Sequence, residues 1–330
     1  MKNRLAKIII IFFILINCKL SLAQEQFEFN VTEIEVYENG TKFKGLKRGK
    51  ISTDNKINLE ANQFEYDKST NILIANGNVI IKDLINDILI ETENVIYKKN
   101  EEIIFTNSRS KATGKNTIIN ADSFKYNKNT NELNAKGNAK IEDLIKKTIV
   151  TSDKINYFKN EEKFNTKGNS KAYDNGLTIK ADEFEYDKIL NIINAYKNVV
   201  INDEIQDVII FTEKSTYFRN QEKINTQGKT EAVSENKYNF KSKDNVFLRN
   251  EGVLSSVFNT IITDDEDNVY KFDNFNYLTN TKILRGNNIK ITTNYKKEKS
   301  DDFIFSNGIF NLEKKEFIAK DTKVFLHNNI

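Results

Sequence analysis

Ala61-Asn62-Gln63-Phe64-Glu65-Tyr66-Asp67 is the stretch that decides the fold, because the chain repeats it twice more with few changes. It returns as Ala121-Asp122-Ser123-Phe124-Lys125-Tyr126-Asn127 and again as Ala181-Asp182-Glu183-Phe184-Glu185-Tyr186-Asp187, each time 60 residues further on. A fixed period of this kind is typical of proteins that stack one small unit many times, since each unit covers the apolar face of its neighbour. The sequence therefore predicts an elongated repeat array.

Each 60-residue period is itself double, because an aromatic residue followed by a polar turn recurs about every 30 residues. The series is Tyr37, Tyr66, Tyr97, Tyr126, Tyr157, Tyr186, Tyr217, Phe247 and Tyr277. On both sides of these turns apolar and polar residues alternate, which is the pattern of half-buried strands. Turns of about four residues join antiparallel strands, whereas a parallel crossover needs a dozen residues or more. The pattern predicts an all-β, antiparallel fold.

Four glycines, Gly77, Gly137, Gly168 and Gly228, fall in the middle of predicted strands. Glycine at such a position usually marks a bend or a close approach of the backbone. We expect the strands to bend there and to pass from one sheet into a second sheet that faces it. Proline is absent from all 330 residues, as suits long strands in which every backbone N–H is used.

The N-terminus predicts export from the cytoplasm. Basic residues precede an apolar run at residues 8–16, and Ser21-Leu22-Ala23 offers small residues for cleavage; we predict a signal peptide over residues 1–23. The alternative is a lipoprotein signal that would lipidate Cys18. Cleavage after Ala23 leaves 46 basic against 47 acidic residues, so the basic pI of the whole chain gives no reason to expect a nucleic-acid partner.

The remaining chain divides into residues 24–234, which carry the repeats, and residues 235–330, where the aromatic spacing persists but the repeated wording is lost. No catalytic residues, cofactor or metal site is predicted. His327 is the only histidine, and no nucleophile motif or phosphate loop is found. Asp83, Asp143 and Asp203 recur at the period; we interpret them as turn formers and consider calcium ligation the weaker alternative.

The repeated segment, together with Ala75-Asn76-Gly77-Asn78-Val79-Ile80-Ile81 and Ala135-Lys136-Gly137-Asn138-Ala139-Lys140-Ile141, resembles the OstA-like domain family of lipopolysaccharide transport. The resemblance covers residues 55–235. It implies a periplasmic β-jellyroll whose two facing sheets enclose an open, taco-like groove for lipopolysaccharide, at the outer membrane side of the cell envelope. Length and the segment 311–327 are most similar to the N-terminal periplasmic part of the LptD type, and a long bridge protein of the LptA type is the alternative. Lys197 departs from the pattern, which expects glycine.

The resemblance also gives the candidate site, an apolar lining for the acyl chains of lipid A. The residues expected to form it are Phe64, Tyr66, Leu73, Val79, Ile81, Ile104, Phe124, Tyr126, Leu133, Ile141, Phe164, Phe184, Tyr186, Val199, Ile201 and Ile224. Taken without the resemblance, the same alternation favours a closed sandwich core, and only the resemblance favours the groove.

Two expectations about partners follow. The open strand edges of such an array predict pairing with other jellyroll transport proteins; contact with an outer-membrane barrel is left open. The alternative function is a cell-envelope structural or adhesin-like β-repeat protein that holds no lipid.

Overall fold

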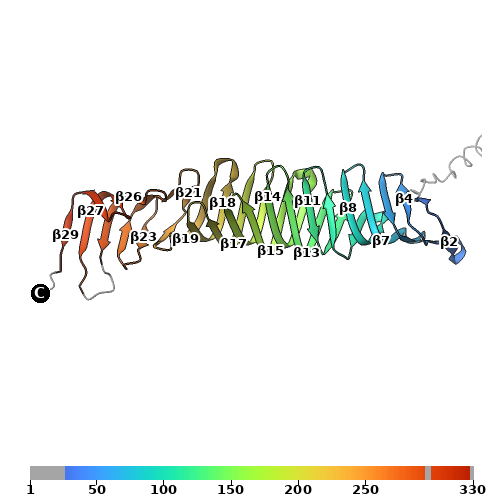
Figure 1. Ribbon diagram of the computed structural model, residues 1–330, viewed down its shortest axis with the longest axis horizontal. Helices are drawn as coiled ribbons and strands as arrows, with labels where there is room; N and C mark the ends of the chain where they lie inside the picture. The colour runs from blue at the N-terminus through green and yellow to red at the C-terminus, as the bar shows by residue number, and fades with distance from the viewer. Residues whose placement is uncertain (1–26, 294–298, 328–330) are drawn as a thin grey trace, which may run out of the picture.

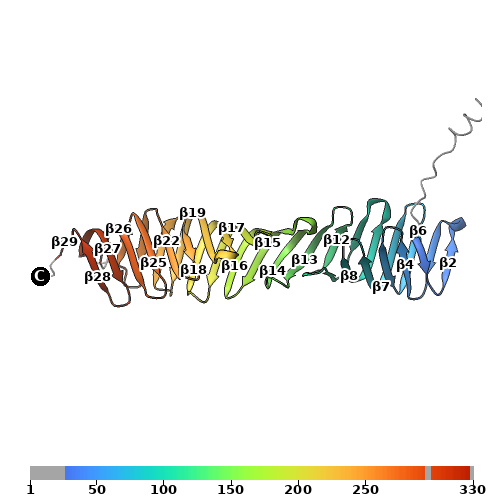
Figure 2. The same ribbon diagram turned by 90° about the horizontal axis from the view of Figure 1, so that it is seen from above.

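The computed structural model describes residues 27–293 and 299–327, and these form one elongated antiparallel β-structure. Its strands run across the long axis, and the chain advances from one end of the molecule to the other without turning back (Figures 1 and 2). All described strands belong to a single hydrogen-bonded network of 29 strands. The predicted all-β, antiparallel and elongated fold is confirmed (Figure 1).

Short strands build the N-terminal end and the first repeats. They are β1 (Phe27–Asn30), β2 (Ile34–Tyr37), β3 (Lys42–Gly45), β4 (Gly49–Thr53), β5 (Ile57–Ala61), β6 (Gln63–Asp67), β9 (Ile103–Thr106), β10 (Ser110–Thr113), β11 (Thr117–Ala121) and β12 (Ser123–Asn127). Long strands lie between and after them: β7 (Ile72–Asp83), β8 (Ile88–Lys98), β13 (Glu132–Asp143), β14 (Thr148–Phe158), β15 (Lys163–Asp174), β16 (Leu177–Asp187), β17 (Ile192–Asp203), β18 (Val208–Phe218) and β19 (Lys223–Ser234).

The C-terminal part continues the same network with strands that are mostly shorter. They are β20 (Tyr238–Lys243), β21 (Val246–Leu248), β22 (Val253–Ser256), β23 (Thr260–Thr263), β24 (Val269–Phe272), β25 (Asn274–Leu278), β26 (Ile283–Thr292), β27 (Asp302–Asn311), β28 (Glu316–Lys320) and β29 (Lys323–Phe325). Single 3-10 turns occur at η1 (Glu38–Gly40), η2 (Lys99–Glu101), η3 (Lys159–Glu161) and η4 (Arg219–Gln221). Because β19 pairs with both β20 and β21, hydrogen bonding runs on through residue 235, and the two-part division remains a prediction.

The long strands bend at the predicted glycines. Gly77 has φ 78° and the following Asn78 has φ 47°, and the β7–β8 register shifts between Asn76 and Val79. The same pair of left-handed residues occurs at Gly137-Asn138 and at Gly168-Asn169, whereas at Gly228 only the glycine is left-handed. A left-handed residue inside a strand turns the chain sharply, so β7, β13, β15 and β19, which carry these glycines, each contribute one arm to each of two facing halves. The expected bends at these glycines are confirmed. The expected second sheet is not found, because all described strands belong to one network.

Hydroxyl side chains lie inside the bends and satisfy backbone groups that the bulges leave unpaired. The Thr166 hydroxyl accepts from the amide of Phe184 at 2.9 Å and lies 2.6 Å from the Ser170 hydroxyl. Thr106 and Ser110 repeat these contacts one period earlier. A buried amide without a partner costs about 1–3 kcal/mol, so these small polar residues stabilise the fold on the bend side.

The predicted signal peptide, including Cys18, lies outside the described residues. Within residues 27–293 and 299–327, the structure contains no helix that has the length and the apolar character needed to cross a bilayer.

Candidate functional site

The sixteen side chains predicted to line a lipid groove all lie in the interior, between the two halves of the folded sheet. Their exposed fractions range from 0% at Phe64 to 9% at Tyr66. They belong to one continuous apolar cluster that extends from Ile51 to Leu312. In this structure they fill the interior, so a groove for acyl chains exists only where the two halves separate. The role of these residues in holding lipid remains a prediction.

Two rows of hairpin turns face each other on the side opposite the bends, and we call this side the mouth. One row, the tyrosine turns, follows the aromatic series and includes turns 127–132, 158–163, 187–192, 218–223 and 248–253. The other row, the opposite turns, includes turns 83–88, 113–117, 143–148, 174–177 and 203–208. The mouth is where the halves could part without breaking strand pairing.

Three periodic aspartates shape the opposite turns. The Oδ1 atoms of Asp83, Asp143 and Asp203 each accept hydrogen bonds from the amides two and three residues further on. The interpretation of these residues as turn formers is therefore confirmed. Their second oxygens face the mouth: Oδ2 of Asp83 accepts from the Tyr126 hydroxyl at 2.8 Å. Burial and this neighbouring carboxylate raise the pKa of Tyr126.

Two buried arginines join the rows. Arg219 Nε and Nη2 donate to the two carboxylate oxygens of Asp174 at 2.7 and 2.9 Å, and Nη2 also donates to the Lys146 carbonyl at 3.0 Å. Arg249 Nε donates to Asp203 at 2.6 Å, and its Nη2 donates to the Asn175 carbonyl at 3.2 Å. Each arginine on a tyrosine turn thus binds two successive opposite turns.

Two lysines continue this series toward the N-terminus. Lys188 Nζ lies 3.3 Å from Asp143 and 2.7 Å from Glu162, and it donates to the Thr117 hydroxyl at 3.0 Å. Lys159 donates to the carbonyls of Asn86 and Asp87. We call Lys159, Lys188, Arg219, Arg249 and their partners across the mouth the polar clasp.

The two lysines differ in their electrostatic surroundings. Burial lowers the pKa of Lys159. Burial also acts to lower the pKa of Lys188, but the hydrogen bond with Glu162 and the nearby Tyr157 and Asp143 outweigh it, so that pKa is raised. Within the described chain Lys159 makes no ion pair, whereas Lys188 makes two. Lys159 is thus the clasp cation whose charge is least well compensated.

The polar clasp was not predicted from the sequence, although the sequence contains a signal for it. A basic residue stands two positions after successive members of the aromatic series, at Lys68, Lys99, Lys128, Lys159, Lys188, Arg219 and Arg249. In a chain with 50 lysines and arginines, such a residue is readily taken for a solvated turn residue. The acidic partner of such a residue lies far away in the sequence. It can be identified only when the two rows of turns are known to face each other.

A cavity of about 230 Å³ opens at the mouth beside the turn 113–117. Its inner wall is apolar and includes Ile88, Ala112, Ile119, Leu133 and Tyr157, and its polar rim includes Asp87, Lys115, Lys159, Glu162 and Lys188. It is smaller than the range of roughly 300–1,000 Å³ usual for ligand pockets. It can therefore admit part of an amphipathic molecule but not a whole lipid.

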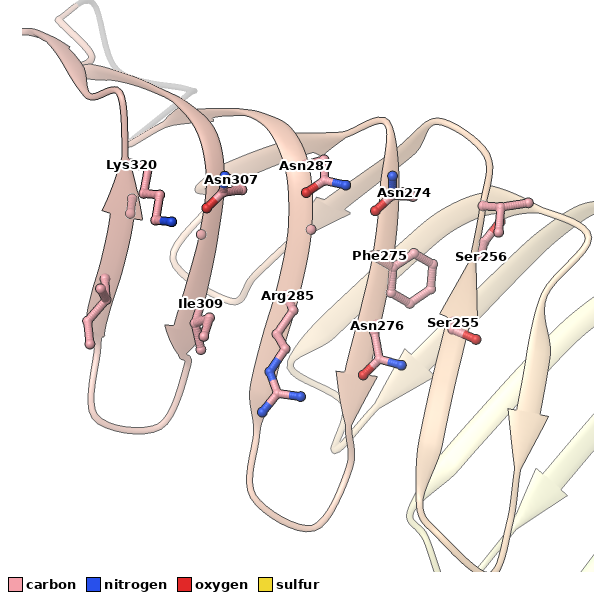
Figure 3. A pocket seen from close by; sticks show the side chains of 15 residues that line it. Ser255, Ser256, Asn274, Phe275, Asn276, Arg285, Asn287, Asn307, Ile309 and Lys320 are labelled. Atoms are coloured by element: carbon pink, nitrogen blue, oxygen red, sulfur yellow. The ribbon is translucent and has the colours of Figure 1, made fainter.

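A separate hollow of about 520 Å³ lies on the outer face of the C-terminal strands (Figure 3). Asn274, Asn287 and Asn307 stand opposite one another across β25, β26 and β27, and Lys320 follows on β28 (Figure 3). The hollow reaches Ile318 on β28, whose side chain is 80% exposed. This surface therefore adjoins the C-terminal edge of the network.

Both ends of the network present strands that are paired on one side only within the described chain. At the N-terminal end β2 pairs with β3 alone, and its Val36 side chain is 55% exposed. At the C-terminal end β28 and β29 each pair with β27 alone, and Phe325 is 53% exposed. Unpaired edges with exposed apolar side chains favour pairing with a further strand.

Comparisons with known proteins give a family match and similar solved structures. Residues 19–143 match the family model described as lipopolysaccharide-assembly, LptC-related. This match confirms the resemblance to lipopolysaccharide-transport proteins over that part of the chain; the particular likeness to LptD stays a prediction. A comparison with curated proteins finds no match.

Among solved structures, the chain is similar to LptH, the LptA-homologous periplasmic component of the lipopolysaccharide transport device of Pseudomonas aeruginosa. The identity is 18%, and the similarity covers 42% of this chain and 81% of that chain. The TM-score is 0.20, a value too low for any argument to rest on it.

Proposed function

We propose that this chain is a non-enzymatic component of lipopolysaccharide transport that works in the periplasm, next to the outer membrane, and shelters acyl chains between its two halves. The observation that carries the proposal is the apolar interior, which is continuous along the array and closed at the mouth by side-chain contacts. The match of residues 19–143 to the LptC-related family supports the same function.

The energies involved are compatible with opening the mouth. Each methylene group removed from water gains roughly 0.8 kcal/mol, so an acyl segment of about ten methylenes gains roughly 8 kcal/mol. Breaking one buried ion pair costs about 3–5 kcal/mol when the charges are left without partners. One inserted acyl chain can therefore offset the loss of one or two contacts of the polar clasp. Apolar contacts have no fixed direction, so a held chain can still slide along the interior.

The end strands are the proposed contacts with other transport proteins. An added strand at β2, or at β28 and β29, would continue the antiparallel network and cover the exposed apolar side chains there. Stacking of this kind would extend the interior from one protein into the next. The exposed Val36 and Ile318 lie on these edges, as expected for surfaces that become covered on assembly.

The alternative is a structural protein of the cell envelope that carries no lipid, and the filled interior is the observation that favours it. A parallel β-solenoid is not compatible with the structure, because every described strand pair is antiparallel. The alternative therefore takes the form of a closed antiparallel array.

Site-specific photocrosslinking in cells distinguishes the two functions. We expect a photoreactive residue at Phe124 or Phe184 to crosslink to lipopolysaccharide, because both side chains point into the interior. The matched controls are the adjacent Lys125 and Glu185, which are exposed on the other face of the same strands. Equal labelling at all four positions, or none at either interior position, would refute the transport proposal.

A further inference from the structure

Three of the four cations in the polar clasp contact two opposite turns each, and the fourth contacts only one. Lys188, Arg219 and Arg249 each contact two successive opposite turns, one on either side. Lys159 contacts the turn 83–88, and within the described residues it has no hydrogen bond or ion pair with the turn 113–117. The clasp is therefore incomplete at that turn.

The 60-residue period explains why Lys159 makes no contact with the turn 113–117. Lys159 stands one period before Arg219, and Gly114 stands one period before Asp174, the carboxylate that Arg219 binds. Gly114 thus occupies the place of the missing acid. A Cβ added at Gly114 would meet only the carbonyl oxygens of Asp87 and Thr117, at 3.8 and 3.9 Å. These are ordinary contacts, so the site has room for the side chain that it lacks.

The cavity beside Gly114 has an amphipathic lining. Lys159 and Lys115 are cations without a carboxylate partner among the described ion pairs, while the third lysine, Lys188, is held by Asp143 and Glu162. The Asp87 side chain at the rim is exposed. Behind this rim the wall consists of interior side chains such as Ile119 and Leu133.

We propose that the opening beside Gly114 is a portal in the mouth that binds a phosphorylated, acylated lipid, with a phosphate at Lys159 and Lys115 and the acyl chain entering between the halves. The proposal rests on the proposed function and assigns the place where the lipid enters. Phosphate oxygens accept charge-assisted hydrogen bonds from lysine, which would give Lys159 a directly bonded anion; within the described residues Asp87, Asp83 and Glu162 act on it electrostatically but form no ion pair with it. The acyl chain would meet the apolar inner wall directly behind.

Restoring the acid tests the portal. Gly114→Asp places a carboxylate opposite Lys159, as Asp174 stands opposite Arg219. The variant thereby adds the missing contact between Lys159 and the turn 113–117. We expect the exported full chain to bind fluorescent lipid A about tenfold more tightly than the same lipid without phosphates, the order of effect of one charge-assisted hydrogen bond. Gly114→Asp and Lys159→Met should both abolish this preference. Gly114→Asn, which has the same shape but no charge, and Lys136→Met on the exposed face of β13 should retain it.

The outcomes separate this inference from the proposed function. If Gly114→Asp keeps the phosphate preference while Phe124 and Phe184 still crosslink to lipopolysaccharide, the portal is refuted and the transport proposal stands. If inorganic pyrophosphate binds at Lys159 as tightly as lipid A does, the site is one for a free anion and the portal is refuted. A photoreactive residue at Asn116 should label lipid A, whereas one at Asn175, in the closed turn 174–177, should not; labelling at Asn175 alone would also overturn the portal.

Discussion

Lys197 occupies a backbone conformation that the other bends give to glycine. Its φ is 63°, and the equivalent residues Gly77 and Gly137 have φ 78° and 77°. A side chain in this left-handed region costs about 1–2 kcal/mol. Lys197 departs from the glycine pattern of the sequence, and the bend is kept in spite of this departure. The exposed ion pair between Lys197 and Glu183 at 3.0 Å offsets little of that cost.

Substitutions at two bends should change stability in opposite directions. Lys197→Gly should stabilise the protein by about 1 kcal/mol, because glycine relieves the backbone strain. Gly77→Ala should destabilise it by about 2 kcal/mol, because the added Cβ is strained and lies 2.8 Å from Asn62 Nδ2. Urea unfolding midpoints measure both. Lys167→Gly, in an exposed strand position with ordinary φ, is the control and should lower stability; a rise there would show that glycine acts by another route.

At the same scale, the candidate site could be predicted only in part. The alternation of apolar residues placed all sixteen chosen side chains in the interior, since a period of two fixes the face of a strand. It could not reveal that Arg219 meets Asp174, because these residues lie on different turns that only the folding of the sheet brings together. Nor could it show that Gly114 leaves a gap, because the significance of a missing carboxylate depends on Lys159 facing it.

The hairpins were the most predictable elements of this protein. Short polar turns and the aromatic spacing indicated antiparallel strands, and mid-strand glycines indicated where strands bend. The two halves, however, are arms of one continuous hydrogen-bonded network and not separate sheets. The loss of the repeated wording after residue 235 suggested a boundary, yet strand pairing continues there. Pairing between strand backbones tolerates changes in the repeated sequence motif as long as the alternation of apolar and polar residues is kept.

The end strands should govern association. We expect the purified chain to self-associate as its concentration rises, and Val36→Lys or Ile318→Lys to suppress this, because a charge on an edge strand opposes pairing with another chain. Ile189→Lys is the matched control, since Ile189 is 71% exposed but lies in a turn in the middle of the array. Sedimentation velocity measures the effect. Association that Ile189→Lys weakens as much as Ile318→Lys would contradict an edge contact.

At the scale of the whole molecule, a row of buried tyrosines lies along the mouth and includes Tyr126, Tyr186 and Tyr217. Burial, the largest influence, raises the pKa of all three phenols above the ordinary value of 10.0. The folded chain therefore keeps protons that the unfolded chain loses near pH 10. The stabilisation is fully present below that pH and is lost as the pH rises above it.

Alkaline unfolding should consequently be steep. Each buried tyrosine should remove about 1.4 kcal/mol of stability per pH unit above about pH 10, and several act together. Melting temperatures measured from pH 8 to pH 12, with tyrosinate absorbance recorded in parallel, check this. Tyr126→Phe should flatten the slope; an unchanged slope in that variant would mean that other groups control the transition.

The local order of strand pairing bears on how the chain can form in the cell. Each strand finds its partners among strands close to it in the sequence, as β13 does with β11, β12 and β14. A polypeptide that becomes available from its N-terminus can then fold segment by segment, and every completed hairpin can serve as a template for the next. Growth in this manner leaves one advancing edge, in addition to the N-terminal edge at β2, with which other chains can pair.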